Sequence, residues 1–137
     1  MNHEQYTRVF VYGTLKPGEV NYDQYCASKI VEETRAVAFG GLFDLPIGYP
    51  AMTLGNSRVE GFVLTFPEDG ILRQLDELED YEPQRKPEEN EYNRHQIETY
   101  SLEGKVLGLS WVYLMTIEQV RLQGGVLLRS GFWNSRC

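Results

Sequence analysis

One carboxylate of the segment 70–81 is predicted to face the interior of the protein. The segment reads GILRQLDELEDY and has the apolar spacing of an amphipathic helix. At about 100° per residue, its apolar stripe spans roughly −20° to 100° and consists of Ile71, Leu72, Leu75 and Leu78. Glu79 falls at about 80°, within this stripe. A buried carboxylate without a partner acquires a raised pKa, and such a group suits general acid–base chemistry at neutral pH.

Two alternatives would leave Glu79 without a chemical role. The residue lies near the end of the expected helix, ahead of Pro83, so the last turn could unwind and release the carboxylate to water. Arg94 or Arg85 could instead neutralise it in an ordinary salt bridge. The angular position alone does not decide between these alternatives and an acid–base role.

A second candidate feature is the sequence VFVYGTLKPGE near the N-terminus, in which a strand expected at Thr7–Tyr12 stops at Gly13. A strand that ends in glycine exposes successive backbone N–H groups. Those of Gly13, Thr14 and Leu15 would suit a carboxylate or an oxyanion. The segment lacks the spacing of a P-loop and of a dinucleotide-binding loop. An ordinary turn is the alternative.

Together the two features predict an acid–base site with an anion anchor. Thr14 is a candidate nucleophile, but no histidine stands in an obvious relation to it. A reaction that needs only proton transfer and stabilisation of an oxyanion therefore fits best. The two histidines, His3 and His95, lie far apart in the sequence, so we expect no metal site. A reaction of this kind needs no cofactor, so we expect none.

Composition restricts the class of protein. The 137 residues, 42% of them hydrophobic, suit one domain, 1–137, with a single core. A net charge of −7 argues against a nucleic-acid partner, and no apolar run is long enough to span a membrane. The polar N-terminus lacks the apolar core of a signal peptide, so we expect a cytoplasmic protein.

We expect no disulfide between Cys26 and Cys137. Phe132 and Trp133 indicate either a contact with another molecule or a cap on the core, and the oligomeric state stays open.

The elements expected to position these residues are mostly strands. We expect strands at 7–12, 31–45, 57–66, 92–102, 105–115 and 125–133, with a bulge or bend at Gly40-Gly41. Helical segments are expected at 21–30, 70–81 and 116–124, the first capped by Asn21. We interpret 46–52 as a turn-rich loop and 79–91 as an exposed, charged loop. This pattern predicts an α+β fold: a small mixed or antiparallel β-barrel with flanking short helices.

Four landmarks, in this order, resemble the gamma-glutamylcyclotransferase-like family. FVYGTLKPG resembles the YG[ST]L opening of that family and is most similar to its gamma-glutamylamine cyclotransferase branch. GGLFDLPIGYPAM resembles its G-x-L-[YF]-x-L…YPA segment, and VEGFVLTF followed by LDELEDY resembles its V-x-G-x-[VL] strand and LDxxE helix. EYNRHQIETY resembles its Y-x-R strand. The resemblance spans about residues 9–115, most of the chain.

The resemblance implies a small barrel with an internal cavity and assigns roles to several residues. The last glutamate of LDxxE is the catalytic acid–base of the family, and that position is Glu79. The YG[ST]L loop, here Tyr12, Gly13, Thr14 and Leu15, would hold the substrate through backbone amides. The tyrosine of Y-x-R, here Tyr92, would lie near the cavity. Relatives often carry a glycine after the catalytic glutamate, where this chain has Asp80.

The family reaction implied by these residues is cyclisation of a gamma-glutamyl amide to 5-oxoproline with release of an amine or amino acid. The substrate's own α-amine attacks its γ-carbonyl, so no nucleophile of the enzyme is needed. The charged loop 81–91 would vary the rim of the site and leaves the leaving amine undetermined. A non-catalytic small-molecule binding domain of the same fold is the main alternative, and a purely structural domain is the third.

Overall fold

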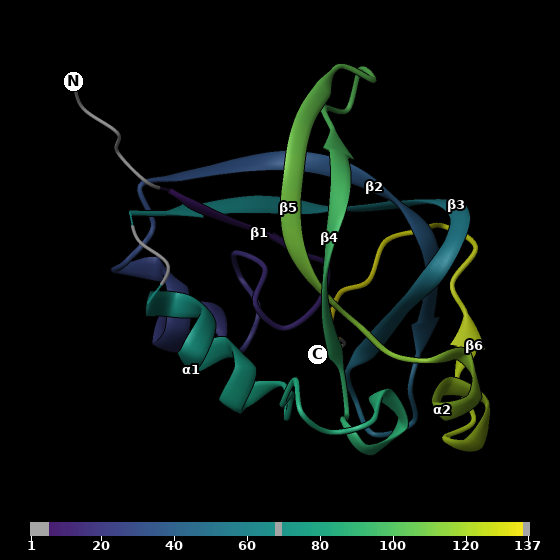
Figure 1. Ribbon diagram of the computed structural model, residues 1–137. Coiled ribbons are helices and arrows are strands. Elements are labelled where there is room, and N and C mark those ends of the chain that lie inside the picture. The colour runs from purple at the N-terminus through teal and green to yellow at the C-terminus, as the bar shows by residue number, and fades with distance from the viewer. Residues whose placement is uncertain (1–5, 68–69, 136–137) are drawn as a thin grey trace.

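The computed structural model describes residues 6–67 and 70–135, and Figure 1 shows the arrangement of its elements. Strands dominate, as the sequence predicts. In chain order the elements are β1 (Thr7–Val11), η1 (Asp23–Ala27), β2 (Glu32–Asp44), β3 (Pro50–Phe66), α1 (Gly70–Leu78), η2 (Pro87–Glu89), β4 (Asn93–Tyr100), β5 (Val106–Leu114), α2 (Ile117–Leu122) and β6 (Val126–Leu127).

Five of the strands close into a barrel. Their hydrogen-bonded order is β3-β1-β5-β4-β2, and β2 pairs again with β3, while the short β6 adds to β2. The pair β1–β5 is parallel, through Val9 and Trp111, and the other pairs are antiparallel. The barrel is therefore mixed, and the predicted fold class is confirmed. The β4–β5 hairpin extends beyond the rest of the barrel (Figure 1).

The expected irregularity at Gly40-Gly41 is present in β2. The register with β3 passes from Gly40 opposite Ser57 to Gly41 opposite Thr53, so β3 contains extra residues at this point. A Cβ atom on Gly40 would lie 2.5 Å from the carbonyl oxygen of Thr53. Only glycine lets the two backbones approach this closely. The expectation of a loop over 46–52 was wrong at its end, because β3 begins at Pro50 and runs through the polar stretch before Ser57.

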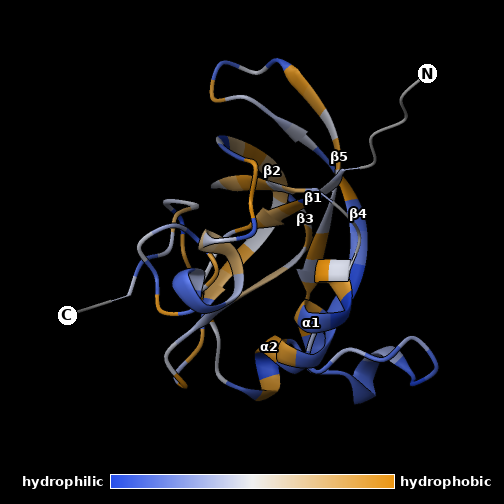
Figure 2. Ribbon diagram, turned by 90° about the vertical axis from the view of Figure 1, so that its left-hand side faces the viewer, coloured by the Kyte–Doolittle hydropathy of each residue, from blue (hydrophilic) through white to orange (hydrophobic). Residues whose placement is uncertain are grey.

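From Val9 onward both faces of β1 are buried, which explains the run of apolar residues there, whereas Arg8 is exposed. Val9 and Val11 belong to the core cluster that lies against α1, together with Leu75. Phe10 and Tyr12 belong to a second cluster. The barrel strands β2 and β3 contain long hydrophobic stretches in Figure 2, whereas the loop after α1 is hydrophilic along most of its length. α1 thus closes one side of the barrel directly beside the loop that follows β1.

The C-terminal part of the chain lies back on the barrel. β6 is shorter than the expected strand over 125–133, because the chain turns between Leu128 and Gly131, where the Gly131 N–H donates to the Leu128 carbonyl. Gly131 has a φ of 72°, and a Cβ atom there would lie 2.1 Å from the carbonyl oxygen of Arg58. The turn buries Trp133 in the second core cluster and leaves Phe132 39% exposed. Capping of the core, one of the two interpretations of these aromatic residues, therefore holds for Trp133.

The helical segments are confirmed with different details. α2 has Thr116 as its N-cap, and the side-chain oxygen of Thr116 accepts the N–H of Gln119. The first segment is a short π-helix, and the expected cap at Asn21 was wrong: its cap position is Tyr22, without a side-chain hydrogen bond. Asn21 contacts the loop after β1 instead. Of the helices in the described ranges, none is long and apolar enough to cross a membrane.

Candidate active site

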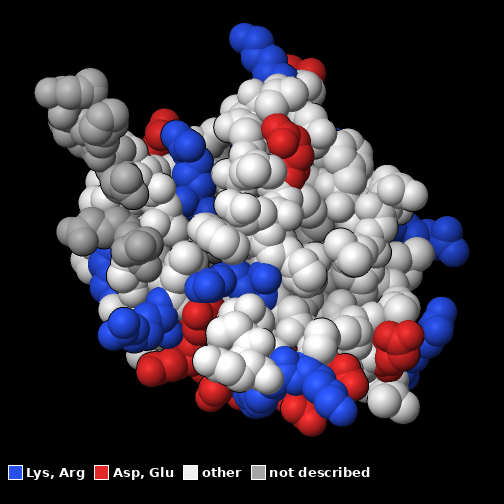
Figure 3. Space-filling view, viewed as in Figure 1, with Lys and Arg blue, Asp and Glu red and all other residues white. Residues whose placement is uncertain are grey.

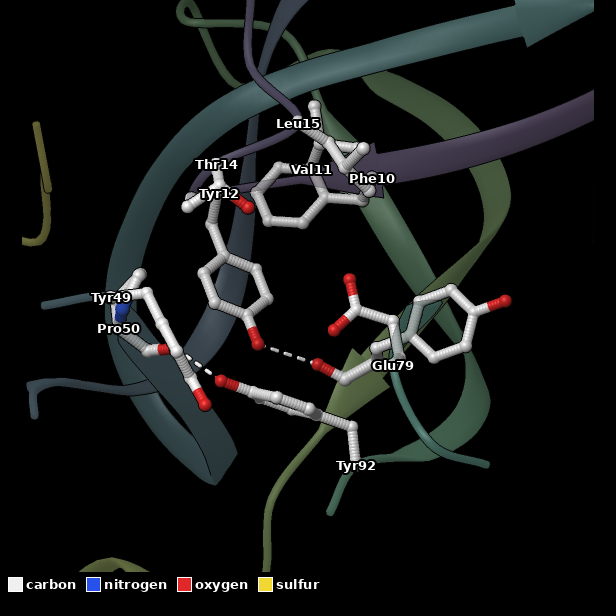
Figure 4. Close-up of a pocket in the computed structure, with 11 residues that line it drawn as sticks. Phe10, Val11, Tyr12, Thr14, Leu15, Tyr49, Pro50, Glu79 and Tyr92 are labelled. Atoms are coloured by element: carbon white, nitrogen blue, oxygen red, sulfur yellow. Dashed lines mark hydrogen bonds between the residues drawn. The ribbon is translucent and has the colours of Figure 1, made fainter. Parts of the chain in front are cut away.

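A pocket of about 410 Å³, including its open mouth, lies between the loop after β1, the end of α1 and the beginnings of β3 and β4 (Figure 4). All six residues that the sequence and the family resemblance single out line this pocket. The complete lining consists of Phe10, Val11, Tyr12, Gly13, Thr14, Leu15, Tyr49, Pro50, Glu79, Tyr92 and Tyr113. Segments far apart in the chain therefore meet at one site.

Glu79 is held at the pocket by the way α1 ends. The helix stops at Leu78, three residues earlier than expected, but the N–H of Glu79 still donates to the Leu75 carbonyl at 2.9 Å. The N–H of Tyr81 donates to the Asp76 carbonyl at 2.9 Å, and that of Asp80 to the next carbonyl along the helix at 3.3 Å. These two bonds form a Schellman motif, which fixes the last turn. The alternative in which this turn unwinds and releases Glu79 is therefore wrong.

The Schellman motif places Asp80 in the left-handed region, with a φ of 58°. Glycine adopts this conformation without a steric cost, whereas most other residues are destabilised there. Aspartate is among the side chains that tolerate it best. The position is also the one at which the family resemblance leads us to expect glycine. The departure from the family pattern thus lies at a helix terminus and changes no pocket-lining side chain.

The Glu79 carboxylate makes no ion pair and no hydrogen bond with any described residue. Arg94 binds Asp76 at 2.9 Å and Arg85 binds Asp80 at 3.2 Å, so the alternative of a salt bridge to Glu79 was wrong. Burial, and secondarily the negative charge of Glu91, raise the pKa of Glu79 from its ordinary value of 4.5 to about 8. In Figure 4 the carboxylate points into the pocket.

Four phenol groups line the same pocket, and each donates its hydroxyl hydrogen to a group other than Glu79. Tyr12 donates to the Tyr113 carbonyl at 2.6 Å, and Tyr92 donates to the Pro50 carbonyl at 2.7 Å (Figure 4). Tyr113 donates to the Asp76 carboxylate at 2.7 Å, and Tyr49 donates to Glu91. Each hydroxyl oxygen can therefore act only as a hydrogen-bond acceptor toward a bound molecule. The side of the pocket near Glu79 is therefore rich in hydrogen-bond acceptors and suits a donor such as an ammonium group.

The opposite side of the pocket consists of the loop after β1 and offers donors. No described backbone acceptor takes the N–H of Gly13, Thr14 or Leu15. Asn21 holds the loop in shape: its N–H donates to the Thr14 carbonyl and its side-chain amide donates to Thr14 Oγ1, both at 2.9 Å. A Cβ atom on Gly13 would lie 2.8 Å from Pro50 Cγ, so glycine is required for this contact. These three residues line the pocket, and a run of N–H groups without a described backbone acceptor suits an anion.

A buried lysine fixes the far end of the same loop. Lys16 is 2% exposed, its Nζ donates to the Trp133 carbonyl, and Nζ lies 3.8 Å from the ring centroid of Phe132. Burial lowers the pKa of Lys16. Trp133 is in turn held by Asp44, whose Oδ1 accepts the indole N–H at 3.1 Å. The returning C-terminal segment thus fastens the N–H-rich loop to the barrel.

The segment after α1 is more ordered than the expected exposed loop. Its residue Asn90 is 1% exposed, so the expectation of full exposure was wrong at this position. The Asn90 side chain donates to the Glu82 carbonyl at 3.1 Å and to Asn93 Oδ1 at 2.9 Å, and it accepts the N–H of Glu82. Gln119 of α2 donates to the Asn90 carbonyl at 2.7 Å. Together these bonds hold the rim of the pocket.

Sequence reasoning missed five of the eleven lining residues, among them the two phenols Tyr49 and Tyr113. Tyr49 belongs to the GYPA segment, so its place in that landmark was an available signal. Tyr113 reaches the pocket through the pairing of β5 with β1, which no local pattern reveals. Cys26 is buried and free, whereas Cys137 and His3 lie outside the described residues. Within the described ranges, no three residues of the types His, Cys, Asp and Glu are placed to hold a metal ion together.

The fold and the pocket define a small mixed β-barrel in which a carboxyl group of raised pKa faces an N–H-rich loop. Comparison with known families gives a more specific assignment. The family model "Gamma-glutamyl cyclotransferase, AIG2-like" matches residues 9–135. The chain therefore belongs to this family, and the family named from the sequence landmarks is confirmed.

Individual relatives agree with this assignment. A Vibrio cholerae protein with the name "Putative gamma-glutamylcyclotransferase" is 35% identical over 128 residues, which cover 93% of this chain and 96% of that protein. The gamma-L-glutamyl-butirosin B gamma-glutamyl cyclotransferase of Niallia circulans is 32% identical over 105 residues, 77% of this chain and 65% of that protein. An AIG2-like protein from Mus musculus has a crystal structure with a TM-score of 0.63 at 24% identity, over 82% of this chain and 78% of that one. At this identity the structural likeness supports the fold alone.

Proposed function

We propose that the protein is a gamma-glutamylcyclotransferase that converts a gamma-glutamyl amide into 5-oxoproline and a free amine or amino acid. The observation that supports this proposal most is the Glu79 carboxylate, which lines the pocket without an ionic partner among the described residues. It faces a loop whose N–H groups donate to no described backbone acceptor. The family assignment and the names of the relatives point to the same reaction class.

The two sides of the pocket match the two charged ends of a gamma-glutamyl head group. Its α-ammonium group fits the acceptor side, formed by Glu79 and the hydroxyl oxygens of Tyr12 and Tyr92. Its α-carboxylate, or the oxyanion that develops at the γ-carbonyl, fits the N–H groups of Gly13, Thr14 and Leu15. Binding at both ends folds the substrate so that its amine meets its own carbonyl carbon. This orientation lowers the entropic part of the barrier.

In the reaction, Glu79 carries protons from the attacking nitrogen to the leaving nitrogen. The ionised carboxylate accepts a proton from the α-ammonium group, and the freed lone pair attacks the γ-carbonyl carbon. The new C–N bond closes a five-membered ring, and the carbonyl oxygen becomes an oxyanion. Glu79 then donates its proton to the amide nitrogen, the old C–N bond breaks, and the carbonyl reforms. The extra proton that remains on the ring nitrogen then passes through Glu79 to the released amine. Glu79 is therefore ionised again at the end, and no proton is consumed overall.

The raised pKa of Glu79 supports this role. A carboxyl group with a pKa of about 8 holds a proton readily and also releases it near neutral pH. The approaching ammonium group stabilises the ionised form, because opposite charges within a few ångströms favour ionisation. Binding of the substrate therefore lowers the pKa of Glu79 and favours the ionised carboxylate that acts as the base.

The test is formation of 5-oxoproline from a panel of gamma-glutamyl amides, followed by mass spectrometry. We expect the wild type to form it and Glu79→Gln to lose at least about 100-fold in kcat, since general acid–base catalysis contributes a factor of this order. Glu77→Gln serves as the matched control, because Glu77 is an exposed acid of the same helix. It should keep wild-type activity.

Two results would contradict the proposal. If folded wild type forms no 5-oxoproline from any member of the panel, the catalytic interpretation fails. The alternative of a binding domain would then predict that the wild type binds a gamma-glutamyl amide without turnover and that Glu79→Gln weakens this binding. If Glu79→Gln retains wild-type turnover, the reaction does not depend on the carboxylate, and the assignment of Glu79 fails.

A further inference from the structure

The pocket has only one charged residue in its lining, and no lysine, arginine or histidine is among the lining residues. A second carboxylate lies next to it. Glu91 is half-buried, and its Oε2 accepts the hydroxyl of the pocket residue Tyr49 at 2.5 Å. Glu91 forms no ion pair with a described residue, and its other oxygen, Oε1, accepts no hydrogen bond from one. The site therefore carries a second negative charge that the described part of the protein leaves uncompensated.

The position of Glu91 is fixed relative to Glu79. The N–H of Glu91 donates to the Asp80 carbonyl, and that of Tyr92 donates to the Glu79 carbonyl, both at 3.3 Å. The neighbouring Asn90 is buried and joins this segment to the rest of the rim. The two carboxylates are close enough for the charge of Glu91 to contribute to the raised pKa of Glu79.

Nearby cations do not neutralise this second charge. Arg85 and Arg94, which come from the same part of the chain, bind Asp80 and Asp76. In Figure 3 acidic and basic side chains lie side by side along the lower edge of the molecule, where Figure 1 places α1 and the loop that follows it. Among the described acids only Glu60, Asp76 and Asp80 form ion pairs, so Glu91 differs from the other unpaired acids by its place beside the pocket.

A count of charges in the proposed complex indicates what Glu91 would bind. This step rests on the proposed function. The gamma-glutamyl head group has one positive and one negative charge, which Glu79 and the N–H-rich loop match. The remaining part of the substrate, beyond the γ-carbonyl, is the leaving amine. Only this part can supply a cation for Glu91, and a carboxylate there would meet repulsion.

We infer that Glu91 is a specificity-determining residue that selects substrates whose leaving amine carries a second positive charge, such as an alkyl diamine. The second ammonium group donates to Oε1 of Glu91, while Tyr49 continues to donate to Oε2. Substrates whose leaving group carries a carboxylate are disfavoured at the same position. Glu91 does not take part in bond making or breaking.

The experiment uses three gamma-glutamyl amides of equal length that differ in one terminal group. Their amines are butane-1,4-diamine, pentan-1-amine and 5-aminopentanoate, which end in an ammonium, a methyl and a carboxylate group. The kcat/KM of each is measured for the wild type, for Glu91→Gln and for the control Glu88→Gln, which alters an exposed acid of the same loop. Release of the amine and formation of 5-oxoproline are both followed.

We expect the wild type to prefer the diamine amide over the pentylamine amide by about tenfold, the size of one charge-assisted hydrogen bond, and to process the carboxylate amide least. Glu91→Gln should bring the three values within about threefold of one another, because the charge-assisted hydrogen bond is lost, while Glu88→Gln leaves the order unchanged. Glu91→Gln should also lower the pKa seen in the pH dependence of kcat/KM, because one cause of the raised pKa of Glu79 is removed.

Three results would overturn the inference. The first is a wild type without preference for the diamine amide, and the second is a preference that survives Glu91→Gln. The third comes from the wild type alone and does not depend on the folding of a variant: a preference that stays constant between low and high ionic strength is not an ion pair. Turnover of the uncharged amide in these cases shows that the proposed function stands and only the role of Glu91 fails. No turnover of any amide instead refutes the proposed function and this inference with it.

Discussion

The replacement Glu79→Gln should make the protein more stable, and the gain should grow with pH. The pKa of Glu79 is about 8 in the folded protein and 4.5 in its ordinary state, which stands for the unfolded chain. A carboxyl group with a raised pKa holds its proton more tightly when folded, so its ionisation opposes folding. Its contribution to stability is fully present below about pH 4.5 and is lost as the pH rises through about 8. Glutamine keeps the shape and does not ionise.

The magnitude follows from the same two values. Each pH unit between them changes the free energy of unfolding by about 1.4 kcal/mol for one proton. Over the whole interval from 4.5 to about 8 the full effect is about 5 kcal/mol. Water in the open pocket reduces the burial of the carboxylate, so we expect about 2 kcal/mol or more. Such a difference is a large part of the stability of a domain this size.

The assay is urea unfolding of the wild type, Glu79→Gln and Glu77→Gln at pH 5, 6.5 and 8. The free energies of wild type and Glu79→Gln should nearly coincide at pH 5 and separate progressively toward pH 8. The midpoint of thermal unfolding should separate in parallel, by about 3–5 °C for each kcal/mol. Glu77→Gln, at an exposed position, should follow the wild type at every pH.

One result would refute the electrostatic reasoning directly. If the difference between Glu79→Gln and wild type is the same at pH 5 and pH 8, the carboxyl group titrates alike in the folded and unfolded chain. Glu79 would then not be desolvated, and the acid–base role would lose its physical basis. A Glu79→Gln variant that is less stable at pH 8 would indicate that the carboxylate has a favourable partner.

Two further predictions concern the segments that hold the site. Asp80→Gly should raise the stability by about 0.5–1 kcal/mol, because glycine favours a φ of 58° and the lost surface ion pair with Arg85 contributes little. Asp80→Ala should lower it, and if both variants are destabilised in thermal unfolding the conformational argument is wrong. Asn21→Ala should raise the KM for a gamma-glutamyl amide several-fold with little change in kcat, since it removes the hydrogen bond to Thr14 Oγ1. A change in thermal stability with an unaltered KM would show that Asn21 does not act through the loop.

The orientation of Glu79 could be predicted because helical periodicity is a local property. The apolar residues of α1 repeat every three or four positions, and this spacing defines the buried side of the helix without reference to the rest of the chain. The end of the helix was harder to predict. Its Schellman motif depends on Asp80 adopting a positive φ. Aspartate tolerates this conformation but does not require it, so the residue type alone does not predict it.

The surroundings of Glu79 could be predicted only in part, because they depend on pairing between distant strands. The approach of Tyr113 follows from β5 lying beside β1, and no sequence pattern reveals that these two distant strands are neighbours. Whether Arg94 pairs with Asp76 or with Glu79 likewise depends on the three-dimensional positions of the two carboxylates, which the sequence does not reveal. Where the family resemblance supplied the landmarks, as for Tyr92, the residue could be assigned to the pocket without knowledge of the strand order.

The parallel contact between β1 and β5 has a consequence for how the molecule folds. The hydrogen bond from Tyr12 to Tyr113 spans 101 residues, and that from Lys16 to Trp133 spans 117. During synthesis the loop that follows β1 leaves the ribosome long before the segments that contain Tyr113 and Trp133. Contacts of such long sequence separation slow folding. The pocket should therefore be among the last parts of the molecule to form, after the local β2–β3 and β4–β5 pairs.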